Sequence, residues 1–193
     1  MRLTMIGLVA AFLLGGCAHP INIAPDASKL QASAPAVHVD KVVAYYISPE
    51  QRDAAVTTPG GGGDKVTYRP YKEIEGGFYK MLSNVFKDVV VLQSPDDAKT
   101  ISAKSVVYVI KPVIKTDSSS PSALTWPPTH FSAELTCTVS DPTGKVVLTQ
   151  TVSGQGAAEW DEFKHDFSLS GKRATQDALL KMQEVLAKAP ELK

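Results

Sequence analysis

Carboxylates around position 160 are the side chains in this sequence that come nearest to a catalytic set. Glu159, Asp161, Glu162 and Asp166 surround Trp160 and His165. Paired carboxylates in a cleft can act as general acid and general base. Acidic residues on a loop are more often solvated surface, and nothing in the sequence directs these four at a common point. A hydrolase of glycans or peptides is therefore the last of three hypotheses.

Neither a metal site nor a catalytic nucleophile is indicated elsewhere. None of the four histidines stands at a metal-ligand spacing, and no CxxC or GxSxG motif is present. The glycines at 60–63 do not form a phosphate loop, because Asp64 follows them and Lys65 precedes Val66 rather than serine or threonine. We expect a mobile surface loop at residues 60–63. Because no catalytic or metal-binding motif is indicated, we also expect that the protein is not an enzyme and needs no metal or cofactor.

Composition limits the class of partner. Of the 193 residues, 44% are apolar and 21% are charged, which is typical of a water-soluble globular domain. The 20 basic residues balance the 20 acidic ones, so no basic excess is available to neutralise nucleic-acid phosphates. We expect no nucleic-acid partner, and no polybasic cluster is present that could hold an anionic membrane surface.

The first sixteen residues have the pattern of a signal peptide. Arg2 supplies a positive charge, and residues 3–14 are apolar except for Thr4. A helix of that length measures about 18 Å, which is too short for a bilayer core of about 30 Å but typical of a signal-peptide core. Two glycines and a cysteine follow directly.

Those closing residues, Leu14, Gly15, Gly16 and Cys17, resemble the lipobox of bacterial lipoproteins. The resemblance implies that a peptidase cuts before Cys17, and that the cysteine carries a diacylglycerol and an N-acyl lipid as a stable membrane anchor. Residue 18 is alanine and not the aspartate that retains enteric lipoproteins, which implies the periplasmic face of the outer membrane in preference to the inner membrane. Cys137 would then have no disulfide partner, and its strand-like surroundings predict a small buried side chain.

Two segments carry aromatic side chains that could bind a partner. One holds Trp126, Pro127 and Pro128 on an expected loop, and the other holds Trp160 and Phe163. Large aromatics anchor protein interfaces, so both segments are candidate protein-binding surfaces. The alternative is that the rings fold back and cap the sheet, which is the commoner outcome for large aromatics.

The apolar pattern predicts the elements that must position these residues. Strands are expected at 37–48, 88–92, 105–115, 130–140 and 145–156, the last two joined by a turn at 141–144. Amphipathic helices are expected at 71–87 and 173–189, whereas residues 157–171 have no assignable pattern. This order predicts an α+β fold, with a mostly antiparallel β-sheet and two amphipathic helices packed on one face.

Three segments, taken in order, resemble the YajG-type lipoproteins and related small bacterial envelope lipoproteins. They are the short strand at 21–23 with its linker, the strand and polar turn at 42–53, and the hairpin at 131–156 with a helix behind it. The likeness is one of layout, and the loops at 60–63 and 126–128 are not part of it. It implies an envelope protein of unassigned activity, with no catalytic residues to carry over.

The chain is thus expected to have a signal peptide at 1–16, a lipidated N-terminus and tether at 17–36, and a single α+β domain at 37–193. The first hypothesis is a non-enzymatic, periplasm-facing lipoprotein that binds another envelope protein. The second is an auxiliary lipoprotein of a transporter or lipid-trafficking system that binds a lipid between helices and sheet. The side chains of such a lipid site would be Phe78, Met81, Leu82 and Met182, which also suit an ordinary core.

Overall fold

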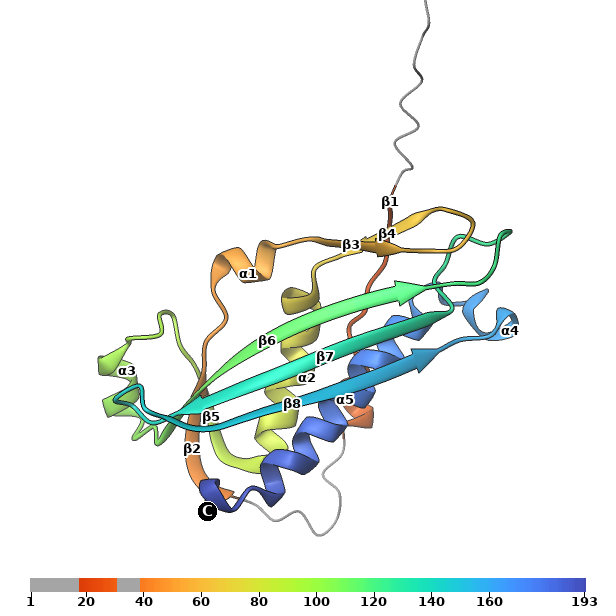
Figure 1. Ribbon diagram of the computed structural model, residues 1–193. Coiled ribbons are helices and arrows are strands. Elements are labelled where there is room, and N and C mark those ends of the chain that lie inside the picture. The colour runs from red at the N-terminus through yellow and green to blue at the C-terminus, as the bar shows by residue number, and fades with distance from the viewer. Residues whose placement is uncertain (1–17, 31–38) are drawn as a thin grey trace, which may run out of the picture.

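The structure, a computed structural model, describes residues 18–30 and 39–193. Figure 1 shows a long, twisted sheet in front of two long helices, with a smaller sheet at one end. The elements follow one another in the order β1 (Ala18–Pro20), η1 (Ala27–Lys29), β2 (Val39–Tyr45), α1 (Pro49–Asp53), β3 (Val56–Pro59), β4 (Lys65–Tyr68), α2 (Pro70–Val85), β5 (Phe86–Val91), α3 (Ala98–Ala103), β6 (Tyr108–Ser119), β7 (His130–Ser140), β8 (Val146–Ala157), α4 (Trp160–Phe163), α5 (Leu169–Lys188) and η2 (Pro190–Leu192).

Within the described residues the strands form two sheets, and both are mixed. The larger has the order β5-β2-β6-β7-β8, and the smaller has the order β1-β4-β3. The long strands β6, β7 and β8 are antiparallel, whereas β2 runs parallel to both β5 and β6. Helices lie between β2 and β5 and between β5 and β6 in the chain, and parallel strands need such crossovers. The predicted α+β class is confirmed, with the long strands antiparallel to one another and β2 parallel to both of its neighbours.

Two amphipathic helices, α2 and α5, pack on the same face of the larger sheet, as predicted (Figure 1). α2 begins at Pro70, because proline suits the first helical turn, where its missing N–H would have no partner. It ends at Val85, and β5 begins at the next residue. The main core lies between these helices and the sheet, and includes Phe78, Met81, Leu82, Phe131 and Met182.

The hairpin expected at 130–156 is present as β7 and β8. Every second residue of β7 from Phe131 to Val139 is buried, and the residues between them are half-exposed. Cys137 is fully buried, and this burial raises the pKa of its thiol. The prediction of a small buried side chain at Cys137 is therefore confirmed.

Among the described residues, three short α-helices occupy segments where the sequence predicted none. The N-terminus of α1 is stabilised by a capping box, in which Ser48 Oγ accepts from Gln51 N (3.1 Å) and Gln51 Oε1 accepts from Ser48 N (2.9 Å). Asp97 caps α3 by accepting from Thr100 N (3.0 Å). α4 lies within the unassigned stretch at 157–171. Helices this short have no room for an apolar stripe, so only their caps mark them in the sequence.

Candidate functional site

The lipidation motif predicted at Leu14 to Cys17 lies outside the described residues, but Ala18, which follows Cys17 directly, lies within them. Ala18 is exposed and opens β1, which pairs in parallel with β4. Immediately after β1, Ile21 N donates to Thr67 O (3.0 Å). The residue that follows Cys17 is thus already part of a sheet.

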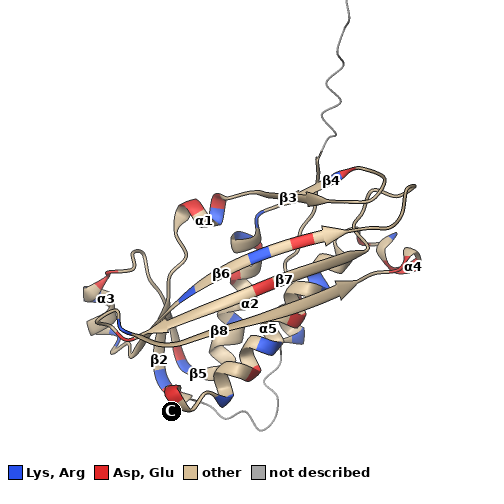
Figure 2. Cartoon of the chain, in the orientation of Figure 1, with Lys and Arg blue, Asp and Glu red and all other residues tan. Residues whose placement is uncertain are grey.

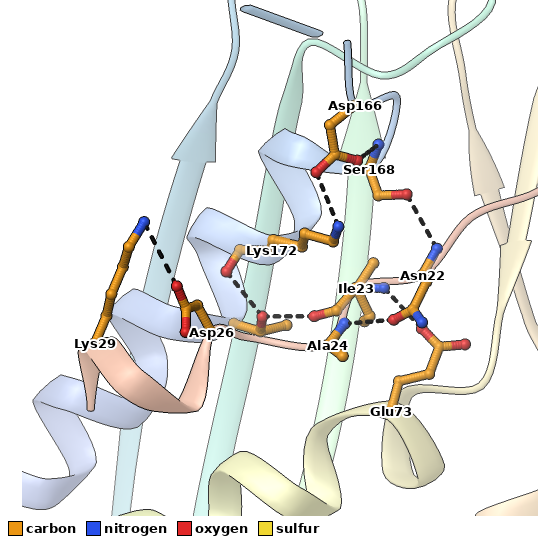
Figure 3. Close-up of polar contacts among 10 residues, drawn as sticks. Asn22, Ile23, Ala24, Asp26, Lys29, Glu73, Asp166, Ser168 and Lys172 are labelled. Atoms are coloured by element: carbon orange, nitrogen blue, oxygen red, sulfur yellow. Dashed lines mark hydrogen bonds and ion pairs between the residues drawn. The ribbon is translucent and has the colours of Figure 1, made fainter.

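The chain then runs between α2 and α5 and is hydrogen-bonded on both sides (Figure 3). Ile23 N donates to Glu73 Oε2 on α2 (2.8 Å), and Ile23 O accepts from Thr175 Oγ1 on α5 (2.7 Å). Asn22 N donates to Ser168 Oγ, directly before α5 (3.1 Å). These bonds fix the N-terminal segment, residues 18–30, to both helices of the domain.

The side chains of the N-terminal segment belong to the main core. Ile23 and Leu30 are fully buried. Gly171 on α5 makes room for Ile23, because a Cβ atom at Gly171 would lie 2.5 Å from Ile23 Cγ2. The tether expected at 17–36 is therefore packed into the domain over residues 18–30, and its strand lies at Ala18–Pro20, not at 21–23. The Ala, Pro and Ser content suggested a flexible chain, but the few apolar side chains bury enough surface to order it.

Of the five predicted binding residues, the structure places two at the surface and three in the interior. Trp126 is half-buried and Trp160 is 58% exposed, whereas Pro127, Pro128 and Phe163 are buried. Trp160 and Phe163 form an edge-to-face pair with ring centroids 5.3 Å apart. The surface that these two segments offer to a partner is therefore mainly that of the two tryptophans.

Trp126 joins segments that are far apart in the sequence. Its ring stacks on His19 of β1, with centroids 4.3 Å apart, and contacts Phe167 before α5 at 5.0 Å. Its carbonyl oxygen accepts from Gly61 N (2.8 Å), so the glycine loop is held against the loop between β6 and β7. Leu124 in the same loop is 95% exposed, and Phe167 is 46% exposed.

We call His19, Leu124, Trp126, Trp160 and Phe167 the anchor-end surface. The elements that carry them, namely β1, the loop between β6 and β7, α4 and the segment before α5, lie at the same end of the larger sheet (Figure 1). Sequence reasoning missed His19, Leu124 and Phe167 in this role, because single residues in unrelated segments form no motif. One signal in the sequence could have pointed to Leu124, namely the absence of charged residues around it. No Asp, Glu, Lys or Arg occurs from residue 118 to residue 133.

The acidic cluster considered for catalysis is a set of ion pairs. Glu162 accepts two hydrogen bonds from the Arg173 guanidinium (2.6 and 3.0 Å). These bonds, and one from Glu159 N, lower the pKa of Glu162 to about 2. Asp161 pairs with Lys164 at 2.8 Å. A carboxylate held ionised by a cation is a poor proton donor at neutral pH, so this arrangement supports the docking of α4 on α5 and not general acid catalysis.

A polar cleft lies beside the N-terminal segment. It has a volume of about 410 Å³ and runs between residues 24–29 and the first turns of α5. Lys29 and Asp26 stand on one wall, and Lys172 and Asp166 form an ion pair of 2.8 Å on the other (Figure 3). Gln176 also lines the cleft, and its Oε1 and Nε2 atoms are buried without a hydrogen-bond partner. A buried amide in this state costs about 1–3 kcal/mol, so a side-chain rotation that turned it toward a polar occupant of the cleft would remove this cost.

The layer between helices and sheet offers little space for a lipid. Phe78, Met81, Leu82 and Met182, the side chains considered for an acyl-chain site, are all buried in the main core. A cavity in this layer, lined by side chains of α2, β7 and α5, has a volume of about 10 Å³, roughly that of one water. Within residues 18–30 and 39–193, no helix is long and apolar enough to cross a membrane. The same residues contain no group of three or more His, Cys, Asp or Glu placed to hold a metal ion.

No protein-family model and no curated protein matches this chain. Among solved structures, a homologue of neuraminyllactose-binding hemagglutinin from Helicobacter pylori is similar at 11% identity, with a TM-score of 0.50, over 82% of this chain and 87% of that chain. A Xanthomonas campestris protein of a family of unknown function is 13% identical, with a TM-score of 0.48, over 89% and 91%. A minor lipoprotein from Acinetobacter baumannii is 10% identical, with a TM-score of 0.42, over 77% and 94%.

These likenesses concern the fold. The chain has the α+β arrangement of the Helicobacter pylori protein, and bacterial lipoproteins are among the chains found to be similar. The resemblance to YajG-type proteins in particular is not tested by them and stays a prediction.

Proposed function

We propose that this protein is a lipid-anchored, periplasm-facing envelope protein that acts without catalysis, by holding a segment of another envelope protein in the cleft beside α5. The observation that carries the proposal is Gln176, a residue of the cleft wall whose carboxamide is buried with both polar atoms unpaired, so that an occupant that drew this side chain into the cleft would pair them. The lipid on Cys17 sets the place of action, and the cleft sets what is bound there.

The chemistry of the cleft suits an extended polypeptide. A carboxamide offers one acceptor and two donors, and a peptide backbone offers the complementary N–H and C=O groups. Both walls carry a cation and an anion, Lys29 with Asp26 and Lys172 with Asp166, so they suit polar side chains of either charge. A volume of about 410 Å³ lies within the range of about 300–1,000 Å³ typical of binding pockets.

Gln176→Leu tests the cleft, because its effects on folding and on binding have opposite signs. Leucine has a similar size and no polar atoms, so the variant removes an unpaired buried amide. We expect the free energy of unfolding to rise by about 1 kcal/mol in urea titrations. In cells, a photo-crosslinker at Lys29 should yield an adduct of one defined mass, and that adduct should be lost in Gln176→Leu.

The matched control is the same crosslinker at Lys104, which is exposed and follows α3 at the other end of the sheet. Adduct formation at Lys104 should be absent in the wild-type chain and in Gln176→Leu alike. If the Lys29 adduct persists in Gln176→Leu, or if Lys104 gives the same adduct, the cleft is not the binding site.

The anchor has a separate test. Cys17→Ser should abolish incorporation of labelled palmitate and leave the chain uncut or soluble. Palmitate incorporation or membrane retention with normal processing in Cys17→Ser would refute the anchor.

Placement in the outer membrane is tested at Ala18. Its side chain is exposed, so substitutions there leave the packing of β1 intact. In an enteric host we expect Ala18→Asp to move the protein to the inner-membrane fraction of a density gradient, and Ala18→Ser to leave it in the outer-membrane fraction. Outer-membrane recovery of both variants would show that this sorting rule does not apply here.

A further inference from the structure

We propose that the anchor-end surface lies on the lipid bilayer, with Leu124, Trp160 and Phe167 inserted at the membrane interface. The proposal rests on the lipid anchor proposed above and adds an orientation to it: the domain does not hang on a tether but rests on the membrane by a defined face.

The covalent geometry brings this end of the domain to the membrane. Consecutive Cα atoms are about 3.8 Å apart, so acyl chains on Cys17 begin one residue from β1. β1 cannot move away from the body, because it pairs with β4 and is followed by the segment clamped between α2 and α5. Whatever surrounds Ala18 is therefore held close to the lipid headgroups.

Two loops near Ala18 carry no charge, although Asp64 and Lys65 at the start of β4 lie directly beside it. No Asp, Glu, Lys or Arg occurs at residues 54–63, which include β3 and the glycine loop, or at residues 118–133, which include the loop between β6 and β7. Figure 2 shows the charged residues of the sheet and helices spread over the body, with this uncharged loop beyond the end of β6. Uncharged backbone and side chains can approach a bilayer without the cost of desolvating ions.

The apolar residues at this end are exposed and also firmly held. Leu124 is 95% exposed, Trp160 is 58% exposed and Phe167 is 46% exposed. The loop that carries Leu124 is fixed to the glycine loop, where Gly61 N and Gly62 N donate to the carbonyls of Trp126 and Ser122 (both 2.8 Å). An exposed leucine is stabilised when it leaves water, and tryptophan favours the interface between lipid and water.

The charges that do lie near this surface predict which lipids it needs. Asp161 pairs with Lys164, and Asp64 lies 3.8 Å from the imidazole of His19. There is no excess of cations at α4 that would favour anionic headgroups. We therefore expect contact with neutral phosphatidylcholine, driven by apolar burial and not by electrostatic attraction.

The two native tryptophans provide the test. The lipidated full chain, purified from membranes, is reconstituted in vesicles of phosphatidylcholine with brominated acyl chains, which quench only fluorophores that contact them. In Trp126→Phe, the remaining Trp160 should lose fluorescence relative to non-brominated vesicles. Leu124→Asp in this background should weaken the loss, and it is expected to fold normally because Leu124 makes almost no contact with the body.

A tryptophan at the other end of the sheet is the control. Val146, 55% exposed at the start of β8, is replaced by tryptophan in a chain with Trp126→Phe and Trp160→Phe, and this probe should not be quenched. If the chain floats with the vesicles but Trp160 is not quenched, or the Val146→Trp probe is quenched equally, the proposed orientation is wrong and the anchor stands. If the chain does not float, the anchor and the orientation both fall.

Discussion

The two ends of the larger sheet differ in how their loops meet solvent. At the anchor end, residues 118–133, which include the loop between β6 and β7, contain no Asp, Glu, Lys or Arg and expose Leu124, and the buried Ile23 ties the N-terminal segment to both helices. At the opposite end, the turn between β7 and β8 carries Asp141 and Lys145, and α3 is flanked by charged residues. The first end thus presents an uncharged loop with an exposed leucine, and the second presents a charged turn.

The largest effect is expected from Ile23→Ala at the anchor end. The side chain is fully buried between α2 and α5, so its truncation should lower the free energy of unfolding by about 2–5 kcal/mol. Val146→Ala, an apolar truncation at the other end, should change it by less than about 0.5 kcal/mol. Urea titrations measure both, and a cost for Ile23→Ala as small as that for Val146→Ala would mean that the N-terminal segment is not part of the fold.

Two glycines give the next comparison. Gly171→Ala places a methyl group against Ile23 and should destabilise the domain by about 1–3 kcal/mol through overpacking. Gly144 has φ +90 and nothing near its would-be Cβ atom, so Gly144→Ala should cost about 1 kcal/mol through backbone strain alone.

Combining each glycine substitution with Ile23→Ala separates overpacking at Gly171 from backbone strain at Gly144. The space freed by Ile23→Ala should absorb the new methyl group, so Gly171→Ala should cost less in that background, whereas the cost of Gly144→Ala should be unchanged. Additive costs at Gly171, measured from thermal unfolding, would show that Gly171 does not act by accommodating Ile23.

Acid should loosen α4 at the anchor end before the domain unfolds. The pKa of Glu162 is lowered in the folded protein to about 2, mainly by its bonds with Arg173, from an ordinary value of 4.5. A lowered pKa means that the ion pair supports the fold above pH 4.5 and is lost as the pH falls toward 2. We expect Trp160 emission to shift over this range in Trp126→Phe.

The control for this pH effect is Arg173→Gln, which removes the cation that holds Glu162. In that variant the Trp160 transition should move to higher pH or disappear, while circular dichroism reports an intact sheet at neutral pH. A transition that is unchanged in Arg173→Gln would mean that another group governs α4.

The smallest effect on stability is expected at the most exposed apolar residue. Leu124→Asp should leave the free energy of unfolding within about 0.5 kcal/mol of the wild-type value, because the leucine is 95% exposed. A loss well above 1 kcal/mol in urea titrations would show that Leu124 packs within the fold, and would remove it from the anchor-end surface.

The elements with a long apolar period could be predicted from the sequence. The alternation in β7 and the helical stripes of α2 and α5 bury one face each, so pattern and structure agree there. The short helices α1, α3 and α4 were missed because they depend on single caps, and the parallel pairing of β2 was missed because strand order depends on distant contacts.

The candidate sites were predicted less well than the fold. Trp126 and Trp160 lie at least partly at the surface, so their binding role stays a prediction, whereas Pro127, Pro128 and Phe163 are buried. No sequence pattern separates exposed from buried aromatic segments here. The cleft beside α5 could not be predicted at all. It depends on residues 24–29 packing beside a helix more than 130 residues later, and their composition is that of a linker.

Cysteine labelling in vesicles tests the orientation of the anchored domain most directly. With Cys17 lipidated and Cys137 fully buried, an introduced cysteine is the reactive thiol. In the lipidated chain on phosphatidylcholine vesicles, Leu124→Cys should react with a membrane-impermeant maleimide far more slowly than Lys145→Cys, whereas in the soluble domain starting at Ala18 the two should react at similar rates. Equal rates on the vesicles would contradict the account.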